Sequence, residues 1–407
     1  MRRYFDSMLC LILLTMVSSA RADDAVTIEV AAGATPRENC LVQFPVPQTW
    51  ADQPQFQLIQ VETGERIPVQ VDRTAVPSQL VWIVRQPLPA GKTRRYQLAP
   101  ETSDSAPETV RVVDDGKHLL VTVAGKPVLT YNHAVVPSPN PDEPYYARSG
   151  YIHPVYNPAG QVVTDDFNPD HPHQHGIMLA WRKMLFEGRE TNGWDQKSGL
   201  GRVEHHRLHE VGGGPVFGFL STRLKHIDLT APDGPKPAIN ENWLVRVYAV
   251  EDTYLFDITS IQSCASPSPV TIEKYHYGGM TMRGHADWHD HRNYDFLTDE
   301  GKTKVDGNQT RPRWVDLFGP IEGKTTGVTI MDHPGNQHFP QPTRLHPTMP
   351  YFCFVPAAVE EFTISPDTPF VSHYRFAVHN GTVDLQTANR LWEDFAHPPK
   401  VRIVDGP

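Results

Sequence analysis

The chain has 407 residues, with 37 Lys and Arg against 47 Asp and Glu, and its formal net charge is −10. An acidic balance of this size argues against a nucleic-acid partner and against a surface that binds anionic lipid. Hydrophobic residues make up 39% of the chain, which is enough for a buried core, and 38 prolines with few helix-period stretches favour a β-rich protein. Composition therefore indicates a globular β protein of one or two domains.

The first 22 residues have the features of a secretory leader. Arg2 and Arg3 are followed by an apolar run over 8–17 and by the small-residue cleavage site Ala20-Arg21-Ala22. The apolar run is shorter than the roughly 20 residues that a membrane span needs. We expect residues 1–22 to be a signal peptide, the mature protein to be exported to the periplasm or the medium, and no membrane insertion once the leader is removed.

Residues 23–105 are predicted to form a small β-sandwich domain. Short apolar and aromatic runs alternate there with proline-rich turns, the pattern of many short strands. The clearest runs are 26–30, 40–44, 56–59 and 80–84. The stretch 100–109, rich in Pro, Glu, Thr, Ser and Asp, has the composition of a linker.

A large β domain is predicted over residues 110–405. Apolar and polar residues alternate over 243–250 and 373–378, as in antiparallel sheets, and 118–130 has the pattern of a hairpin. A sheet of this extent needs a second sheet to cover its apolar face. The fold class predicted is mainly β, a small N-terminal β-sandwich followed by a large antiparallel two-sheet, supersandwich-like domain.

One helix is predicted at the end of the large domain. Leu385, Ala388, Trp392 and Phe395 recur at helical spacing and share one face. The prolines of His397-Pro398-Pro399 end the pattern. We expect this helix to cover the large sandwich.

All 20 histidines lie at or after residue 118, and the densest group is in the segment 170–176. If this segment is extended, His171, His173 and His175 project from one face, about 6.5–7 Å apart, and can address one sugar or one ion. A second group begins at Glu204, next to His205-His206, where a carboxylate beside an imidazole can act as an acid/base pair or share a metal.

Two later segments add polar and aromatic side chains. Arg283 and Trp288 follow Tyr277-Gly278-Gly279, and a fork of donors with an aromatic plate suits polyol recognition. Asp332 and His333 follow the apolar strand 327–331, so we expect them at a strand end, where the carboxylate can orient the ring.

Several of these motifs together resemble one family. The motifs are 171–176 with Ala180-Trp181, Gly201-Arg202-Val203-Glu204-His205, Tyr277-Gly278-Gly279, Asp332-His333-Pro334-Gly335-Asn336, His346-Pro347-Thr348-Met349-Pro350-Tyr351 and Asn389-Arg390-Leu391-Trp392. Over most of residues 25–400 the sequence resembles an uncharacterised, mostly secreted bacterial family of unknown function that carries the label methane oxygenase PmoA. The membrane subunit of that name is an integral membrane protein, which one short, cleavable apolar run cannot provide, so we do not expect the label to describe the activity.

The large domain is also similar in architecture to galactose mutarotase-like supersandwiches. That resemblance implies sugar binding on a concave sheet face and proton transfer by a histidine and a carboxylate. The favoured interpretation is an exported carbohydrate-active enzyme, a hydrolase, lyase or epimerase; no cofactor is indicated with certainty, and a divalent metal is possible. Its predicted catalytic residues are His173, His175, Glu204, Asp332 and His333. Its predicted substrate contacts are Arg283, Trp288, Tyr277, Asn336 and His346.

Two alternatives stay open. One is a metal-dependent enzyme in which His171, His173, His175 and His206 hold a divalent ion, because neutral imidazole binds several such metals. The other is a glycan-binding or scaffold protein without catalysis. The expected partner is a carbohydrate ligand, and no nucleic-acid partner is expected.

Overall fold

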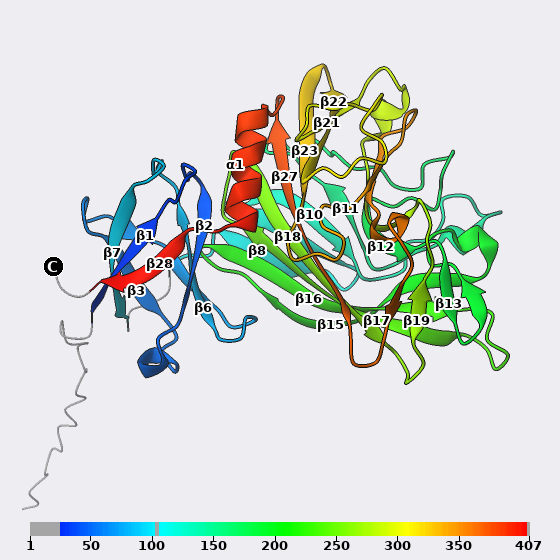
Figure 1. Ribbon diagram of the computed structural model, residues 1–407, viewed down its shortest axis with the longest axis horizontal. Coiled ribbons are helices and arrows are strands. Elements are labelled where there is room, and N and C mark those ends of the chain that lie inside the picture. Colours follow the sequence, from blue (N-terminus) through cyan, green and yellow to red (C-terminus); the bar gives the residue numbers. More distant parts are fainter. Residues whose placement is uncertain (1–24, 102–105, 405–407) are drawn as a thin grey trace, which may run out of the picture.

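The computed structural model describes residues 25–101 and 106–404, so the expected leader lies outside the described residues. The fold is mainly β, as the sequence predicts, with five sheets and one α-helix in this part of the chain (Figure 1). Strands pair in the antiparallel sense in each sheet. Within residues 25–101 and 106–404, no helix combines the length and apolar character needed to span a membrane.

The small sandwich consists of two sheets. In spatial order, the first contains β28 (Lys400–Val404), β1 (Val26–Ala31), β7 (Thr93–Pro100), β3 (Phe56–Gln60) and β4 (Arg66–Ile67). The second contains β2 (Cys40–Pro45), β6 (Gln79–Val84) and β5 (Val69–Asp72), and the short 3-10 helix η2 (Gln48–Trp50) follows β2. Trp82 of β6 packs edge-on against Tyr96 of β7, with ring centroids 5.9 Å apart, in the core between the sheets.

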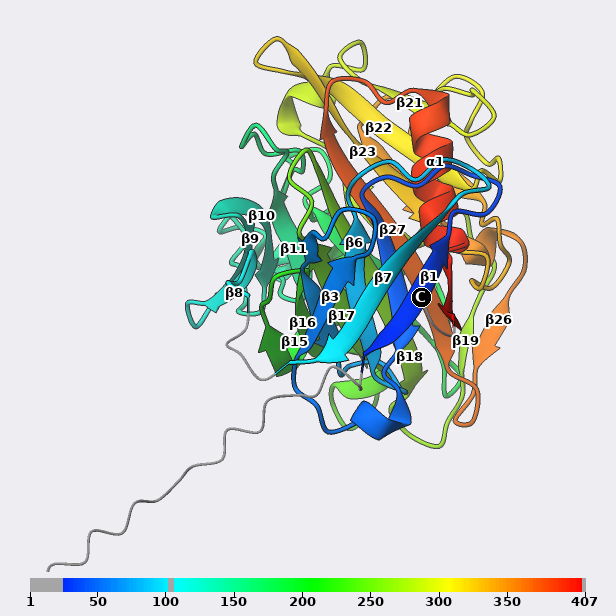
Figure 2. The ribbon, with the colours of Figure 1, turned by 90° about the vertical axis from the view of Figure 1, so that its left-hand side faces the viewer.

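The last strand of the chain belongs to this small sandwich. β28 pairs with β1 from Thr27 opposite Val404 to Ala31 opposite Lys400, so the two strands lie side by side (Figure 2). The sequence placed these C-terminal residues with the large domain. Their alternation is short and offers no signal of which sheet edge they join.

The small and large bodies share buried surface. In β6, Leu80, Trp82 and Val84 face the small core. Val81 and Ile83, on the opposite face of the strand, belong to the large core. Strand β6 therefore has almost no solvent face, which explains its unbroken apolar run. A buried ion pair also joins the bodies, because Arg37 Nη1 lies 2.8 Å from Asp394 Oδ1 in the C-terminal helix.

Two eight-stranded sheets form the large sandwich. One has the order β24 (Thr343–Leu345), β25 (Tyr351–Phe354), β20 (Gly278–Arg283), β12 (Ile177–Trp181), β11 (Tyr151–Val155), β10 (Lys126–Asn132), β9 (His118–Val123) and β8 (Val110–Asp114). The other has the order β15 (Gly201–Gly212), β16 (Phe217–Asp228), β17 (Lys236–Tyr248), β18 (Thr253–Cys264), β27 (Phe370–Asn380), β23 (Lys324–Asp332), β22 (Trp314–Ile321) and β21 (Asp295–Thr298). Their inward side chains form one apolar core, which is the stacking that the sequence predicts.

A four-stranded sheet and several short helices complete the large body. The sheet has the order β14 (Arg189–Thr191), β13 (Met184–Phe186), β19 (Val270–Ile272) and β26 (Phe362–Ile364). The 3-10 helices are η3 (Pro144–Tyr146), η4 (Gln196–Ser198), η5 (Ala286–His289) and η6 (Pro356–Ala358).

The predicted helix is present as α1 (Leu385–Ala396). Asp384 caps it by accepting a hydrogen bond from Thr387 N at 2.8 Å, and Ala388 and Trp392 are buried. Trp392 Nε1 donates to the carbonyl oxygen of Asp332 at 2.9 Å. The helix thus lies at the boundary between the two bodies, on the ends of β23 and β27 (Figure 1).

The core of the large sandwich contains a buried ionic cluster around Glu241 of β17. Its carboxylate lies 2.7 Å from His226 Nε2 and accepts hydrogen bonds from Trp243 Nε1 and Ser260 Oγ, both at 2.6 Å. Burial alone would raise the pKa of Glu241, but the His226 hydrogen bond and charge, with the two other donors, lower it. The cluster therefore holds a carboxylate without solvent contact.

A second buried pair makes stability depend on pH. His379 Nε2 lies 2.9 Å from Asp316 Oδ1, and although burial favours the neutral ring, this bond and the Asp316 charge raise the pKa of His379. A histidine whose pKa is raised by folding stabilises the folded protein. This contribution is fully present below the unfolded-state pKa of about 6.5 and is lost as the pH rises through the folded-state pKa.

Replacing Asp316 with Asn should therefore flatten the fall in the free energy of unfolding above about pH 6.5. Urea unfolding of both proteins between about pH 6 and pH 9 measures this difference. Equal pH slopes for Asp316→Asn and the unsubstituted protein would contradict the assignment.

Candidate active site

The most chemically varied recess of the large body is an open pocket of about 200 Å³. Its lining residues, here called the histidine pocket, are His171, His173, Gln174, Arg182, Trp194, Asp195, Tyr275 and Tyr277. They come from the turn before β12, from the residue that follows β12, from the loop before η4, and from the segment before β20. Imidazoles, a carboxylate, a guanidinium and aromatic rings therefore meet in one place.

The segment 171–175 is not the extended strand that the three-histidine face requires. Residues 172–173 form a turn, closed by a hydrogen bond from Gln174 N to the His171 carbonyl oxygen at 3.0 Å. Pro172 is suited to such a turn and unsuited to a central strand. His171 and His173 consequently line the pocket together, with ring centroids 5.6 Å apart, whereas His175 points inward and has no exposed surface.

His175 belongs to a buried hydrogen-bond chain behind the turn. Its Nδ1 lies 2.6 Å from Asp166 Oδ1, and Tyr151 donates to Asp166 Oδ2 at 2.7 Å. The backbone is fixed at Gly176, where φ is +27° and a Cβ atom would lie 2.1 Å from the Ile152 carbonyl oxygen. His175 is thus held in one orientation by its partner and by the start of β12.

His173 lines the pocket and has a strongly lowered pKa. Burial, partly opposed by the Asp195 carboxylate, lowers the pKa of His173 to about 4. The ring is therefore a free base at neutral pH, with Tyr146 at a ring-centroid distance of 6.5 Å. Burial raises the pKa of Tyr146, and the Asp195 charge adds to this effect. Asp195 lines the same pocket as His173.

Predicted substrate contacts Tyr277 and His346 also lie here. Tyr277 packs on Trp194 with centroids 5.6 Å apart, and the Arg344 guanidinium lies 5.2 Å from the Tyr277 ring centroid. His346 is 6.5 Å from the His171 ring, and burial with the Arg344 charge lowers the pKa of His346 to about 4. Both residues are therefore placed at or next to the histidine pocket.

Arg283 and Trp288 have structural surroundings instead of an open sugar-binding face. Arg283 is buried and donates from Nη1 to Gln174 Oε1 at 2.8 Å and from Nη2 to His289 Nε2 at 2.6 Å. It supports the turn that carries the pocket histidines. Trp288 is also fully buried and donates to the Pro320 carbonyl oxygen at 3.0 Å, so its ring is not available as the expected plate.

Glu204 and His206 are not brought to the pocket. Both lie on β15, the edge strand of the second eight-stranded sheet, where Glu204 accepts from Arg202 Nε at 2.8 Å and His206 is exposed. The alternation of the strand turns the intervening His205 inward instead, and its Nδ1 lies 3.0 Å from Tyr131 OH. Glu204 and His206 therefore lie outside the residues that line the histidine pocket.

Asp332 and His333 do not form the expected proton-transfer pair. Asp332 is buried, and its oxygens accept hydrogen bonds from Asn336 Nδ2 and Gln341 N, both at 2.7 Å, although burial raises its pKa to about 7. Asn336 also bonds the backbone of His373, so it fixes a loop and is not free for a substrate.

His333 lies in another recess, of about 240 Å³, at the boundary with the small sandwich. Its Nδ1 accepts from Gly335 N at 3.0 Å, and its ring packs 5.0 Å from Phe395. The strand-end position after β23 is as predicted, but this end of the strand faces α1 and the small sandwich.

The four predicted metal ligands do not converge. His175 is committed to Asp166 and is buried, whereas His206 is exposed on β15. Among residues 25–101 and 106–404, no three His, Cys, Asp or Glu side chains are arranged to hold a metal ion. The donor positions therefore give the metal-dependent alternative no support.

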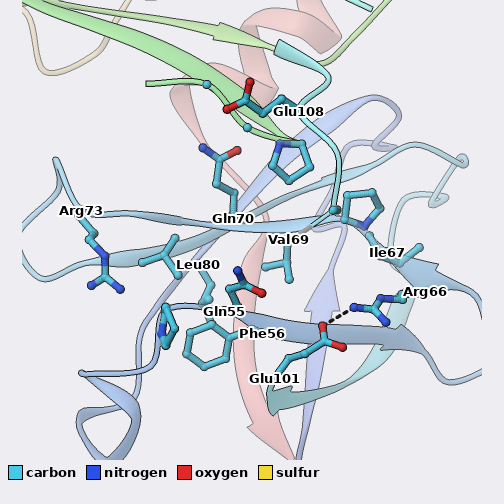
Figure 3. Close-up of a pocket in the computed structure, with 17 residues that line it drawn as sticks. Gln55, Phe56, Arg66, Ile67, Val69, Gln70, Arg73, Leu80, Glu101 and Glu108 are labelled. Atoms are coloured by element: carbon cyan, nitrogen blue, oxygen red, sulfur yellow. Dashed lines mark hydrogen bonds and ion pairs between the residues drawn. The ribbon is translucent and has the colours of Figure 1, made fainter. Parts of the chain in front are cut away.

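A further recess, of about 260 Å³, separates the small sandwich from the loop before β16 (Figure 3). Arg66 pairs with Glu101 on one side, and Gln70 accepts from Val216 N and Phe217 N on the other. No histidine lines it. This recess is a junction between the bodies, and its titratable lining consists of arginines and glutamates in place of imidazoles.

Several residues of the histidine pocket are not among the predicted site residues. These are Gln174, Arg182, Trp194, Asp195 and Tyr275. Trp194 and Asp195 could have been found in the sequence. They place an aromatic ring and a carboxylate directly after the loop-forming residues Asn192-Gly193. Loops carry functional groups more often than strands do, and a histidine-centred search overlooks them.

A model of a family of unknown function, DUF6807, matches residues 118–393. The chain belongs to this family. Its description contains no oxygenase, so the PmoA label of the sequence resemblance gains no support.

Among solved structures, an alpha-mannosidase from Enterococcus faecalis V583 is similar, with a TM-score of 0.50 and 8% identity over 94% of this chain. The chain spans only 46% of that mannosidase, and at this identity the likeness concerns the fold. No curated protein matches the sequence significantly.

The electrostatic link between Asp195 and His173 can be tested without a substrate. The Asp195 charge raises the His173 pKa against the effect of burial, so Asp195→Asn should move the His173 titration below its value of about 4. NMR titration of the imidazole shifts measures this. His118, at the start of β9, pairs with Asp115 and is the internal control. An unchanged His173 titration would show that the carboxylate does not act on the ring.

Proposed function

We propose that the protein is an exported carbohydrate-active enzyme that performs acid–base chemistry on a glycan or modified sugar in the histidine pocket. One observation carries the proposal: the pocket combines a neutral imidazole, His173, with the carboxylate of Asp195 and an aromatic wall. A base of this kind can remove a proton from a sugar or activate water, and a nearby carboxylate can steady the imidazolium that forms. These are the steps shared by hydrolases, lyases and epimerases.

The walls of the pocket favour a sugar over a smaller or wholly apolar ligand. Tyr275 and Tyr277 are half-buried, and such rings offer an apolar face to a sugar and a hydroxyl to its polar edge. The Arg182 guanidinium lies 5.7 Å from the Tyr275 ring centroid and adds hydrogen-bond donors. The fold likeness to a mannosidase is compatible with this class of ligand.

Tyr275 also lines a neighbouring groove of about 610 Å³, together with Lys274, His276 and Arg311 among others. A shared lining residue makes the pocket and the groove adjacent. A single sugar unit in the pocket could therefore continue into the groove as an oligosaccharide. This arrangement supports a glycan longer than one residue as the substrate.

The test is a screen of oligosaccharides for released, unsaturated or isomerised products, with the unsubstituted protein and a His173→Gln variant. Product that depends on His173 supports the proposal. Binding without product from any glycan would instead indicate the non-catalytic glycan-binding alternative. Metal analysis of the active protein, together with its activity with and without a chelator, distinguishes the proposed acid–base enzyme from the metal-dependent alternative.

We also propose that the protein is exported. This part of the proposal rests on the leader features of residues 1–22. Expression of the full chain, followed by N-terminal sequencing of the exported protein, tests it. Mature protein beginning after Ala22 is the expected result, and full-length protein retained inside the cell would contradict it.

A further inference from the structure

The groove next to the histidine pocket carries positive charge on its walls. Its volume is about 610 Å³, within the roughly 300–1,000 Å³ typical of ligand sites, and residues of the segments 274–276, 309–311, 342–343 and 355–359 line it. Lys274 and Arg311 are permanent cations in this lining, and no aspartate or glutamate of the described chain belongs to it. The protein as a whole has a formal net charge of −10, so this recess, here called the cationic groove, departs from the overall balance.

The two cations of the groove are exposed and lack a carboxylate partner. Neither Lys274 nor Arg311 forms an ion pair with another residue of the described chain. The Arg311 side chain is nonetheless held in place, because Nε donates to the Pro340 carbonyl oxygen at 2.7 Å and Nη2 donates to the His338 carbonyl oxygen at 2.8 Å. These carbonyl groups are neutral. They fix the guanidinium without cancelling its charge, so that it remains available to an anion.

The acidic residues beside the groove do not neutralise it. Glu273 lies 3.7 Å from Lys183, and Glu360 lies 3.9 Å from His338. Glu361 is exposed, and none of the three glutamates lines the groove. Because these carboxylates flank the lining segments from outside, an anion inside the groove meets the cations first.

The groove is continuous with the histidine pocket. Tyr275 lines both recesses, and the Arg344 guanidinium lies 5.2 Å from the ring centroid of Tyr277 in the pocket. On the groove side, burial and then the Arg344 charge lower the pKa of His276, which also lines the groove. Arg344 therefore adds positive charge at the junction of the two recesses.

The floor of the groove is apolar. Pro342 and Val355 are buried in the lining, and Ala358 and Val359 are half-buried there. An apolar floor with charged side chains on the walls suits a chain of sugar rings, whose C–H faces are apolar and whose substituents are polar.

We propose that the cationic groove binds the anionic groups, carboxylate or sulfate, of a glycan whose reacting unit occupies the histidine pocket. The inference rests on the proposed function and names the substrate class as an acidic glycan. Arg311 offers charge-assisted hydrogen bonds to such a group, and Lys274 adds a second positive charge. An acidic peptide would match the same charges, but the groove joins the proposed sugar-converting pocket at Tyr275, which favours a glycan.

Calorimetric titration of the purified protein tests the groove. The probes are tetrasaccharides of alginate, pectate, hyaluronan and kappa-carrageenan, each compared with the same chain after methyl-esterification of its carboxylates or removal of its sulfates. We expect the charged form of at least one chain to bind about tenfold more tightly than its neutral form, with about threefold from each cation. The preference should shrink between about 0.01 M and about 0.15 M salt, where the screening length falls from about 30 Å to about 8 Å. A response to the uronate chains or to the sulfated chain identifies the anionic group.

Substitutions separate the charge of the groove from its shape. Lys274→Gln and Arg311→Gln should each lower the preference for the charged form by about threefold, whereas Lys274→Arg keeps the charge and should keep the preference. Lys324→Gln removes the charge of an exposed lysine at the start of β23, outside the groove, and is the matched control. Because Lys274 is exposed, Lys274→Gln should unfold at the same urea concentration as the unsubstituted protein.

Equal affinity for the charged and neutral forms of all four chains would overturn the assignment, as would a preference that survives Lys274→Gln combined with Arg311→Gln. Oligoglutamate that binds as tightly as the best glycan, and less tightly to the same variants, would assign the groove to an acidic peptide instead. Product from a neutral glycan together with equal affinities would overturn the groove and leave the proposed function intact. A preference for charged chains without product from any glycan would support the groove and contradict the enzyme. The absence of any binding and any product would overturn both.

Discussion

His173→Gln is expected to lower kcat/KM for the responsive glycan by about a hundredfold to ten-thousandfold. The reason is that glutamine keeps the approximate size and polarity of the side chain but cannot accept a proton near neutral pH. The pKa of about 4 for His173 leaves the unsubstituted ring unprotonated over the whole neutral range. Activity that needs this base should therefore be lost only as the pH falls towards about 4.

The control for this variant is His291→Gln, which changes an exposed histidine whose side chain is 64% accessible. It should retain full kcat/KM, and both variants should unfold at the same urea concentration as the unsubstituted protein. The measurement is the pH dependence of kcat/KM for each. A His173→Gln enzyme with a rate within a factor of about three of the original would exclude His173 as the base.

Glu241→Gln is expected to reduce the free energy of unfolding by about 3–5 kcal/mol. The carboxylate accepts from His226, Trp243 and Ser260 in a fully buried position. An amide places two donors where an oxygen accepts, so at least one of these three partners loses its acceptor inside the core. Buried polar groups without partners are among the few mechanisms that give losses of this size.

Urea unfolding at neutral pH measures the effect, and Glu210→Gln is the matched control. Glu210 is exposed on β15, so this control should change the free energy of unfolding by no more than about 0.5 kcal/mol. A loss below about 1 kcal/mol for Glu241→Gln would mean that the core adapts to the amide and that the cluster contributes little to stability.

Local patterns predicted the fold class because each depends on neighbouring residues. The hairpin at β9 and β10 and the helix α1 follow from alternation, turn residues and spacing, all visible in short windows. The place of β28 does not follow, because strand pairing across the length of the chain depends on which sheet edge is free.

The candidate site was predicted in part for the same reason. The motif 170–176 supplies His171 and His173, which line the histidine pocket, whereas Asp195 of this pocket is not among the predicted residues and the predicted Glu204 lies outside it. Asp195 lines the same pocket as His171 and His173, whereas Glu204 is next to histidines only in the sequence. The sequence alone does not show which carboxylate folding brings to the pocket. Asp332 shows the converse, since a strand-end aspartate next to a histidine forms bonds to Asn336 and Gln341 instead.

The pairing of β28 with β1 has a consequence for the order of events during synthesis. The first strands leave the ribosome early, but the five-stranded sheet that contains them is complete only after residue 404 has been translated. Until then β1 presents an unpaired edge, which is prone to contacts with other chains. Shortening the chain by its last eight residues should therefore harm the earliest-made part of the protein more than the body that contains the histidines.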